Sequence, residues 1–123
     1  MFQVRVLLVD DQEAFMRALV AVVGATPNFD VVGRARTGEE SLVLASEVNP
    51  DLVLMDVNLP GIDGLEATRR LRARSSPPVV VLLSTHDEDA GEQYLAESGA
   101  HEYVTKSAFG PQRLAECWSR SQG

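Results

Sequence analysis

An apolar run that ends in a single carboxylate limits what this chain can fold into more than any other stretch. Leu52–Met55 has the length and composition of a strand buried on both faces, and Asp56 follows it directly. A proline–glycine turn begins at Pro60, and Asp63 with Glu66 forms the capping-box pattern of a helix start. The stretch therefore predicts a strand, a turn and a helix. Ligands bind at the strand ends of open α/β sheets, although such an aspartate can also simply cap a loop.

The same alternation of strand and helix runs through the whole chain. Apolar, β-branched runs predict strands at Val4–Val9, Asp30–Ala35, Leu52–Met55, Val79–Leu83 and Glu102–Thr105. Helices are predicted from Phe15 to Pro27-Asn28, from the Thr37–Glu40 capping box to Asn49-Pro50, over Leu65–Arg74, from Asp87–Asp89 through Leu95 to Gly99, and from Pro111 through Trp118. This alternation predicts one doubly wound α/β domain around a five-stranded parallel sheet. The weaker Asp30–Ala35 run is expected near a sheet edge.

The composition argues against several classes of function. A formal net charge of −7 over 123 residues disfavours direct nucleic-acid binding by this domain, because phosphate contacts need a basic surface. The single cysteine, Cys117, cannot form an internal disulfide and is predicted to be a small apolar residue of the last helix. No apolar stretch reaches the roughly 18 residues of a membrane span, and no signal peptide precedes Val4, so a cytoplasmic location without membrane contact is expected.

Polar side chains follow four of the predicted strands. They are Asp10-Asp11, Asp56, Ser84-Thr85 and Lys106. Because the carboxyl ends of parallel strands meet at one edge, these residues are expected to converge. The carboxylates are the hard oxygen ligands that Mg²⁺ prefers, while Lys106 can hold an anion and Ser84 can donate a hydrogen bond to it. The set favours phosphoryl transfer onto Asp56, although either acid of the pair can instead cap a helix and Lys106 can be a solvated loop lysine.

Together these motifs resemble the receiver domain of two-component response regulators. The resemblance runs from Val4 to about Trp118 and is carried by the acid pair, the Asp56–Gly64 segment, Ser84-Thr85 and Lys106. It implies the flavodoxin-like strand order 2-1-3-4-5. It also implies a receiver domain over residues 1–118, followed by a tail or the start of a linker at 119–123.

The resemblance implies a reaction and a metal site as well. A sensor histidine kinase would donate a phosphoryl group to Asp56, and the domain would catalyse only its own phosphorylation and dephosphorylation. Mg²⁺, or Mn²⁺, would be bound by the carboxylates of Asp11 and Asp56, by the backbone carbonyl of Asn58, and by Asp10 through water.

Two further residues would transmit the signal. Ser84 would follow the phosphoryl group, and Tyr103 would act as an aromatic switch beneath an output surface of the last two helices and the last strand. Tyr103 also suits a simpler role, packed against the last helix with its hydroxyl in water. The partner of the output surface stays open, and a phosphorylation-dependent homodimer is one expected form.

Three positions depart from the pattern common among receivers. Many receivers have a proline after the lysine that corresponds to Lys106, whereas this chain has Ser107. The subfamily with LuxR-type helix-turn-helix output often lacks that proline as well. That subfamily would bind DNA through a C-terminal domain beyond residue 123. Thr85 is bulkier than the usual alanine or glycine and is expected to restrict access to Asp56. His86 lies at a position that tunes hydrolysis, so His86→Ala is expected to change the phosphoaspartate lifetime.

Three other functions remain as alternatives. A metal-dependent phosphohydrolase acting through Asp56 usually carries a second acid two residues later, where this chain has Asn58. A flavodoxin-like FMN carrier needs a phosphate-binding loop after the first strand, where Asp10-Asp11 would repel the phosphate. A degenerate receiver would serve only as a protein-interaction module, and it would not need the complete acidic set.

Overall fold

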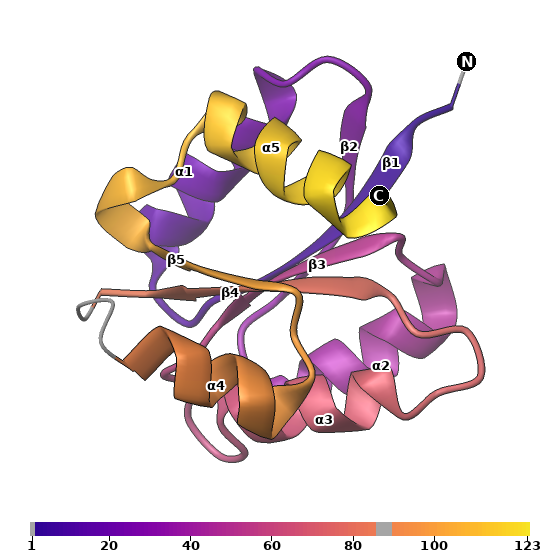
Figure 1. Ribbon diagram of the computed structural model, residues 1–123, viewed down its shortest axis with the longest axis vertical. Coiled ribbons are helices and arrows are strands. Elements are labelled where there is room, and N and C mark those ends of the chain that lie inside the picture. The colour runs from indigo at the N-terminus through magenta and orange to yellow at the C-terminus, as the bar shows by residue number, and fades with distance from the viewer. Residues whose placement is uncertain (1, 86–89) are drawn as a thin grey trace.

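A parallel sheet forms the centre of the molecule. The computed structural model describes residues 2–85 and 90–123. In that part of the chain the strands are β1 (Val4–Val9), β2 (Phe29–Ala35), β3 (Leu52–Asp56), β4 (Val79–Ser84) and β5 (Glu102–Thr105). All neighbouring strands are parallel, in the order β2-β1-β3-β4-β5 (Figure 1). The predicted doubly wound sheet and its strand order are confirmed, and β2 lies at an edge.

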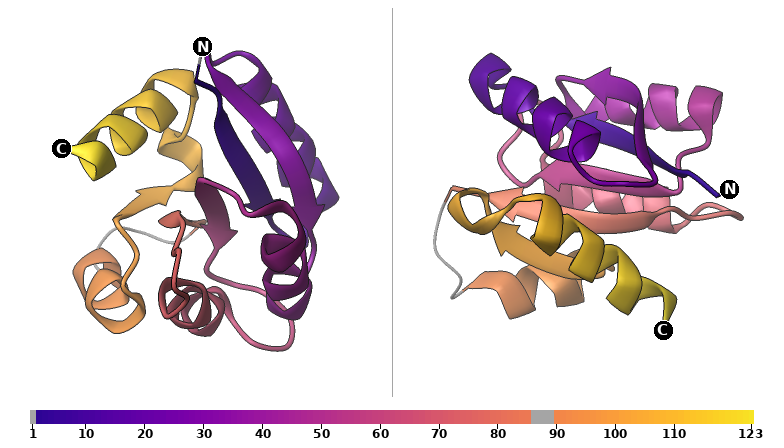
Figure 2. Two further views of the ribbon diagram at one scale, coloured as in Figure 1. Left: turned by 90° about the vertical axis from the view of Figure 1, so that its right-hand side faces the viewer. Right: turned by 90° about the horizontal axis from the view of Figure 1, so that it is seen from above.

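Helices cover both faces of this sheet. They are α1 (Glu13–Gly24), α2 (Gly38–Val48), α3 (Gly64–Arg72), α4 (Gly91–Ser98) and α5 (Pro111–Gln122), with a 3₁₀ turn, η2 (Lys106–Ala108), after β5. Helices α1 and α5 lie on one face, and α2, α3 and α4 lie on the other (Figure 1). The left view of Figure 2 shows α4 and α5 on opposite sides of β5. None of the helices in the described ranges combines the length and apolar character needed to cross a bilayer.

The inner strands are buried because an apolar cluster packs against each of their faces. Alternate residues of β1 join different clusters: Val6 and Leu8 lie under α1 and α5, whereas Leu7 and Val9 lie under α2 and α3. Every residue of β3 is buried, including Asp56 at its carboxyl end. The sheet therefore holds a carboxylate inside the molecule, at the edge where its strands end.

Two helices begin at the predicted capping residues. Thr37 accepts a hydrogen bond from the Glu40 amide at 3.0 Å, and Asp63 accepts one from the Glu66 amide at 2.9 Å. The glutamates do not return the bond to the capping residue. Glu40 accepts from the Arg36 amide, and Glu66 pairs with Arg69 and Arg70 of its own helix. Each predicted capping box is therefore formed in one direction only.

Several element boundaries differ from the predictions. Helix α1 ends at Gly24, before Pro27, since the Thr26 hydroxyl bonds back to the Val22 carbonyl at 2.7 Å. Strands β3 and β4 each run one residue further and take in Asp56 and Ser84.

The ends of the last two helices compare with the predictions as follows. The predicted start of the fourth helix at residues 87–89 lies outside the described residues. As predicted, Gly99 ends α4, and it adopts the left-handed conformation with φ 81°. Helix α5 continues to Gln122, so most of the segment 119–123 is helical, and the division of the chain at residue 118 stays a prediction.

Candidate functional site

Three carboxylates meet where β1 and β3 end. Asp10, Asp11 and Asp56 each place one oxygen within 4.8 Å of the others. Strands β1 and β3 are direct neighbours, with Val9 opposite Met55, so the residues that follow them lie side by side. Asp10 and Asp56 are buried and Asp11 is exposed. One side of the cluster therefore faces the protein interior and the other faces solvent.

The single lysine of the chain reaches into this cluster from the end of β5. Lys106 Nζ lies 2.8 Å from Asp10 Oδ2 and 3.5 Å from Asp56 Oδ2. Its side chain is only 8% exposed, so the ammonium is largely desolvated and held by these two charges. Lys106 begins η2, and its peptide bond to Ser107 is trans, like the others in the described ranges. The turn directs the side chain back towards β1 and β3.

The buried Asp56 carboxyl is easier to protonate than an ordinary aspartate. Burial and the nearby charge of Asp10 together raise its pKa to about 6, because Lys106 offsets only part of their effect. Asp56 Oδ1 accepts a hydrogen bond from the Asn58 amide at 3.1 Å, which also favours the charged form. The site therefore carries more negative charge than its one ammonium neutralises, which is the condition for attracting a cation.

Asp10 faces the site and does not cap the following helix. The N-cap of α1 is Gln12, whose side chain makes no cap hydrogen bond. Asp10 Oδ1 accepts from the Gln12 amide at 2.8 Å. Its other oxygen is close to Lys106 but outside hydrogen-bond geometry, and it accepts no directed hydrogen bond from the residues that the structure describes. A buried carboxylate oxygen with unused acceptor capacity fits a site for a bound water or cation.

The hydroxyl pair at the end of β4 is split between the interior and solvent. Ser84 is buried as the last residue of β4, and Asp56 on β3 pairs with the residue before it, Leu83. Ser84 therefore lies one position further along the same edge than Asp56. Thr85 is exposed. His86 lies outside the described residues.

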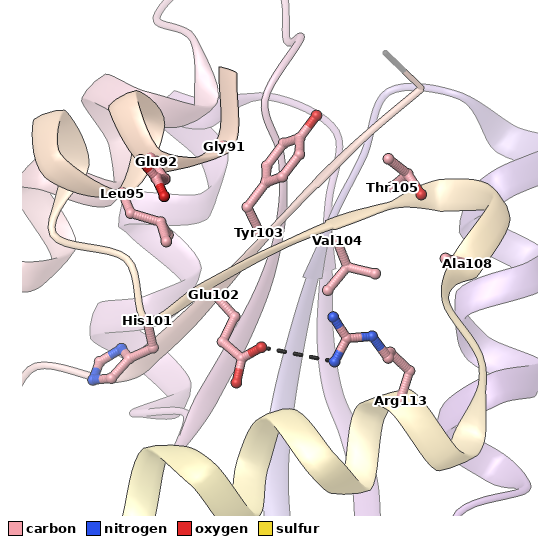
Figure 3. Close-up of a pocket in the computed structure, with 10 residues that line it drawn as sticks. All are labelled: Gly91, Glu92, Leu95, His101, Glu102, Tyr103, Val104, Thr105, Ala108 and Arg113. Carbon is pink, nitrogen blue, oxygen red and sulfur yellow. Dashed lines mark ion pairs between the residues drawn. The ribbon is translucent and has the colours of Figure 1, made fainter. Parts of the chain in front are cut away.

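The tyrosine of β5 lies against α4, as Figure 3 shows. A Cβ atom added at Gly91 would lie 2.9 Å from Cδ2 of Tyr103, so the ring occupies the space that a side chain at position 91 would need. Tyr94 meets the same ring edge-on, with centroids 5.6 Å apart. The ring is thus packed between a glycine and a second aromatic side chain of α4.

A shallow pocket of about 410 Å³ lies between α4, β5 and α5 (Figure 3). Tyr103 lines it on the α4 side, and Glu102 pairs with Arg113 across it at 3.8 Å. Thr105 also lines the pocket, directly before Lys106. None of the three clustered aspartates lines it, and Thr105 of β5 is the lining residue next to Lys106 of the acidic site.

Two residues beside Lys106 were missed by the sequence analysis. Lys106 Nζ lies 4.4 Å above the centre of the Phe15 ring and 3.5 Å from Gln12 Oε1. Phe15 has the helical spacing of a core residue, which is what the sequence indicated, and no local pattern connects it with a lysine at the far end of the chain. Gln12, directly after the acid pair, carried no signal of its own.

Comparison with known proteins agrees with this geometry. A family model described as the response regulator receiver domain matches residues 6–118. The response regulator GacA of Pseudomonas viridiflava is 45% identical over 106 residues, which are 85% of this chain and 49% of that protein. The chain thus spans about half the length of such relatives.

Solved structures agree on the fold. The signal receiver domain of the response regulator NarL from Mycobacterium tuberculosis, which its authors term putative, has a TM-score of 0.86 at 30% identity, covering 95% of this chain and 97% of that one. A LuxR-family two-component response regulator from Aurantimonas sp. has a TM-score of 0.85 at 32% identity, covering 96% of this chain and 84% of that one. The chain therefore belongs to the family of response regulator receiver domains.

Proposed function

We propose that this receiver domain accepts a phosphoryl group on Asp56 and thereby acts as a signalling switch. The main support is the position of the Lys106 ammonium, 2.8 Å from Asp10 and 3.5 Å from Asp56, beside the exposed Asp11. Phosphoryl transfer depends mainly on alignment and on neutralising the charge of the transferred group. A nucleophilic carboxylate, an ammonium and a cation-attracting acid cluster supply these requirements at one edge of the sheet.

The proposed donor is the phosphohistidine of a sensor histidine kinase. An Asp56 oxygen attacks phosphorus, the new O–P bond forms as the N–P bond breaks, and the departing imidazole nitrogen takes up a proton from solvent. Lys106 then pairs with an oxygen of the transferred group, and the ammonium thereby exchanges a carboxylate partner for a phosphoryl oxygen. Hydrolysis returns the domain to its unphosphorylated state. Water attacks phosphorus, the O–P bond to Asp56 breaks, and the free carboxylate and inorganic phosphate result. We propose that the domain catalyses only its own phosphorylation and dephosphorylation.

A divalent cation fits the acid cluster. We expect Mg²⁺ or Mn²⁺ to be held by the carboxylates of Asp11 and Asp56 and the backbone carbonyl of Asn58, with Asp10 acting through water. Once bound, such a cation neutralises charge on the phosphoryl oxygens. The carboxylate oxygens of the three aspartates are the hard ligands that it requires.

Ser84 and Tyr103 are the proposed switch residues. Ser84 is buried one strand away from Asp56 and on the same edge, so it is placed to follow a phosphoryl group there. Tyr103 packs on Gly91 and lines the pocket between α4, β5 and α5. A rearrangement near Ser84 that moves this ring would change the output surface, which is how a local event shifts a two-state equilibrium.

The proposed partners are those expected from the receiver-domain resemblance. They are the histidine kinase, a second copy of the phosphorylated domain, and DNA through a C-terminal domain beyond residue 123, as suggested by the LuxR-family neighbour. The net charge of −7 disfavours direct DNA binding by this domain itself. The cytoplasm is the proposed location, where a lone thiol such as Cys117 stays reduced.

Intact-protein mass spectrometry after incubation with acetyl phosphate and Mg²⁺ tests the proposal. We expect a gain of one phosphoryl group that requires Mg²⁺ and is lost in Asp56→Asn. Asp51→Asn is the matched control, because Asp51 precedes the same strand at its other end and bonds the Arg5 amide. A wild-type protein that gains no mass would instead support a degenerate receiver that acts only through protein contacts.

A further inference from the structure

The segment between Asp56 and α3, residues 57–63, is held close to β3 at its far end. The Gly64 amide donates to the Val57 carbonyl at 2.9 Å. A Cβ atom added at Gly64 would lie only 2.0 Å from the Asp56 carbonyl oxygen, so only glycine permits this approach. The segment therefore leaves the strand and returns to it within a few residues, and its path decides where the backbone carbonyls point.

A glutamate of a different helix holds the middle of this segment. The Ile62 amide donates to Glu39 Oε2 at 3.2 Å. Gly61, with φ 75°, lies directly beneath the same carboxylate, since a Cβ atom there would come within 2.6 Å of Oε2 and 2.7 Å of Oε1. Glu39 thus covers Gly61 and binds the next amide of the segment.

The first turn of α2 is itself fixed against the same segment. A Cβ atom added at Gly38 would lie 2.6 Å from the Ile62 side chain and 2.8 Å from the Ile62 carbonyl oxygen. The Thr37 cap fixes the start of α2 one residue earlier. Glu39, whose side chain is exposed, therefore reaches the segment from a helix start that is fixed against the same segment.

We propose that Glu39 is a positioning residue for the metal site. The proposed function assigns one metal ligand to the backbone carbonyl of Asn58, in the segment that Glu39 holds, and this inference rests on that assignment. A backbone ligand is placed by the path of its segment and not by its own side chain. Glu39 restricts that path by its hydrogen bond to the Ile62 amide. This restriction lowers the entropic cost of ordering the segment when the metal binds.

Glu39 could affect metal binding through its negative charge or through its hydrogen bond to the Ile62 amide, and suitable variants separate these two effects. Glu39→Ala removes both the charge and the acceptor, whereas Glu39→Gln removes the charge and keeps an acceptor oxygen for the Ile62 amide. Glu47→Gln removes one charge from an exposed position on the same helix. The three variants together distinguish positioning from a general loss of attraction for cations.

The test is Mg²⁺ affinity, measured by nuclear magnetic resonance from backbone amide shifts of the full chain, together with hydrogen exchange of the Ile62 amide before Mg²⁺ is added. We expect Glu39→Ala to weaken Mg²⁺ binding about three- to tenfold and to speed exchange of the Ile62 amide. Glu39→Gln should stay within about twofold of the wild type in both measurements, as should Glu47→Gln.

The possible results separate this inference from the proposed function. If the wild type binds no Mg²⁺, the proposed metal site is wrong and the role of Glu39 falls with it. If the wild type binds Mg²⁺ and Glu39→Ala binds it equally well, only the role of Glu39 is overturned. Equal weakening in Glu39→Ala and Glu39→Gln would assign the effect to charge, and would also overturn positioning.

Discussion

The ammonium of Lys106 lies over the face of Phe15, with Nζ 4.4 Å from the ring centroid. The contact is largely desolvated, because the lysine side chain is 8% exposed. Cation–π contacts of this kind are worth about 1–2 kcal/mol. The ring therefore helps to keep the ammonium between Asp10 and Asp56, where phosphoryl transfer would need it.

Replacing this ring is predicted to slow phosphorylation. Phe15→Leu keeps an apolar side chain of similar size but removes the ring face, so Lys106 becomes less firmly placed. We expect the rate of phosphorylation by acetyl phosphate to fall about three- to tenfold. Phe15→Tyr keeps the ring face and should react at close to the wild-type rate. Equal rates in Phe15→Leu and the wild type would show that the aspartates alone position the lysine.

Neutralising Asp56 is predicted to stabilise the metal-free fold above pH 6. The pKa of Asp56 is raised to about 6 in the fold, above its ordinary value, so folding favours the protonated form. The associated stability is complete below about pH 4 and is lost as the pH rises through 6. The asparagine of Asp56→Asn stays neutral at every pH and does not lose this stability. At pH 8 the free energy of unfolding of the variant should therefore exceed that of the wild type by up to about 3 kcal/mol.

Urea unfolding in EDTA at pH 8 and pH 4.5 measures this difference. The advantage of Asp56→Asn should shrink at the lower pH, where the wild-type carboxyl is protonated. Asp51→Asn, at the other end of the strand, should show no such advantage. Added Mg²⁺ should stabilise the wild type more than Asp56→Asn. If the variant were less stable at pH 8, the penalty from burial and from Asp10 would be smaller than the stabilisation from Lys106.

The sequence predicted those parts of the structure that depend on local pattern or on topology. A buried run before Asp56 and a lysine after the last strand are enough to bring the two together, because parallel strands end at a common edge. The caps at Thr37 and Asp63 were predictable since each satisfies amides within its own helix.

Contacts between distant side chains were beyond such reasoning. Phe15 and Glu39 both lie on amphipathic helices, where each has an ordinary explanation as a core residue or as a first-turn acid. Their contacts with Lys106 and Ile62 depend on how helices pack on the sheet. The raised pKa of Asp56 depends likewise on burial and on its distance from Asp10, which a sequence does not specify.

The thiol of Cys117 is predicted to be inert in the folded protein. Burial and the nearby charge of Glu102 raise its pKa to about 11. Cys117 lies on α5, as predicted from the sequence, and its side chain is fully buried in the cluster between α5 and the sheet. A thiol reagent at pH 8 should therefore modify Cys117 only as fast as the protein unfolds, and fully in urea. Rapid modification without urea would show that α5 opens locally from the sheet.

Adding a methyl group at Gly91 is predicted to displace the ring of Tyr103, the proposed switch residue. A Cβ atom at Gly91 would lie 2.9 Å from Tyr103 Cδ2, too close for the ring to stay, whereas Gly24, at the end of α1, has open space there. Gly24→Ala should stabilise the fold by up to about 1 kcal/mol through helix propensity. Gly91→Ala should lose that gain and shift the ring resonances of both Tyr103 and Tyr94. Equal stabilisation by the two variants, with unchanged ring resonances, would show that the packing on Gly91 does not hold Tyr103 in place.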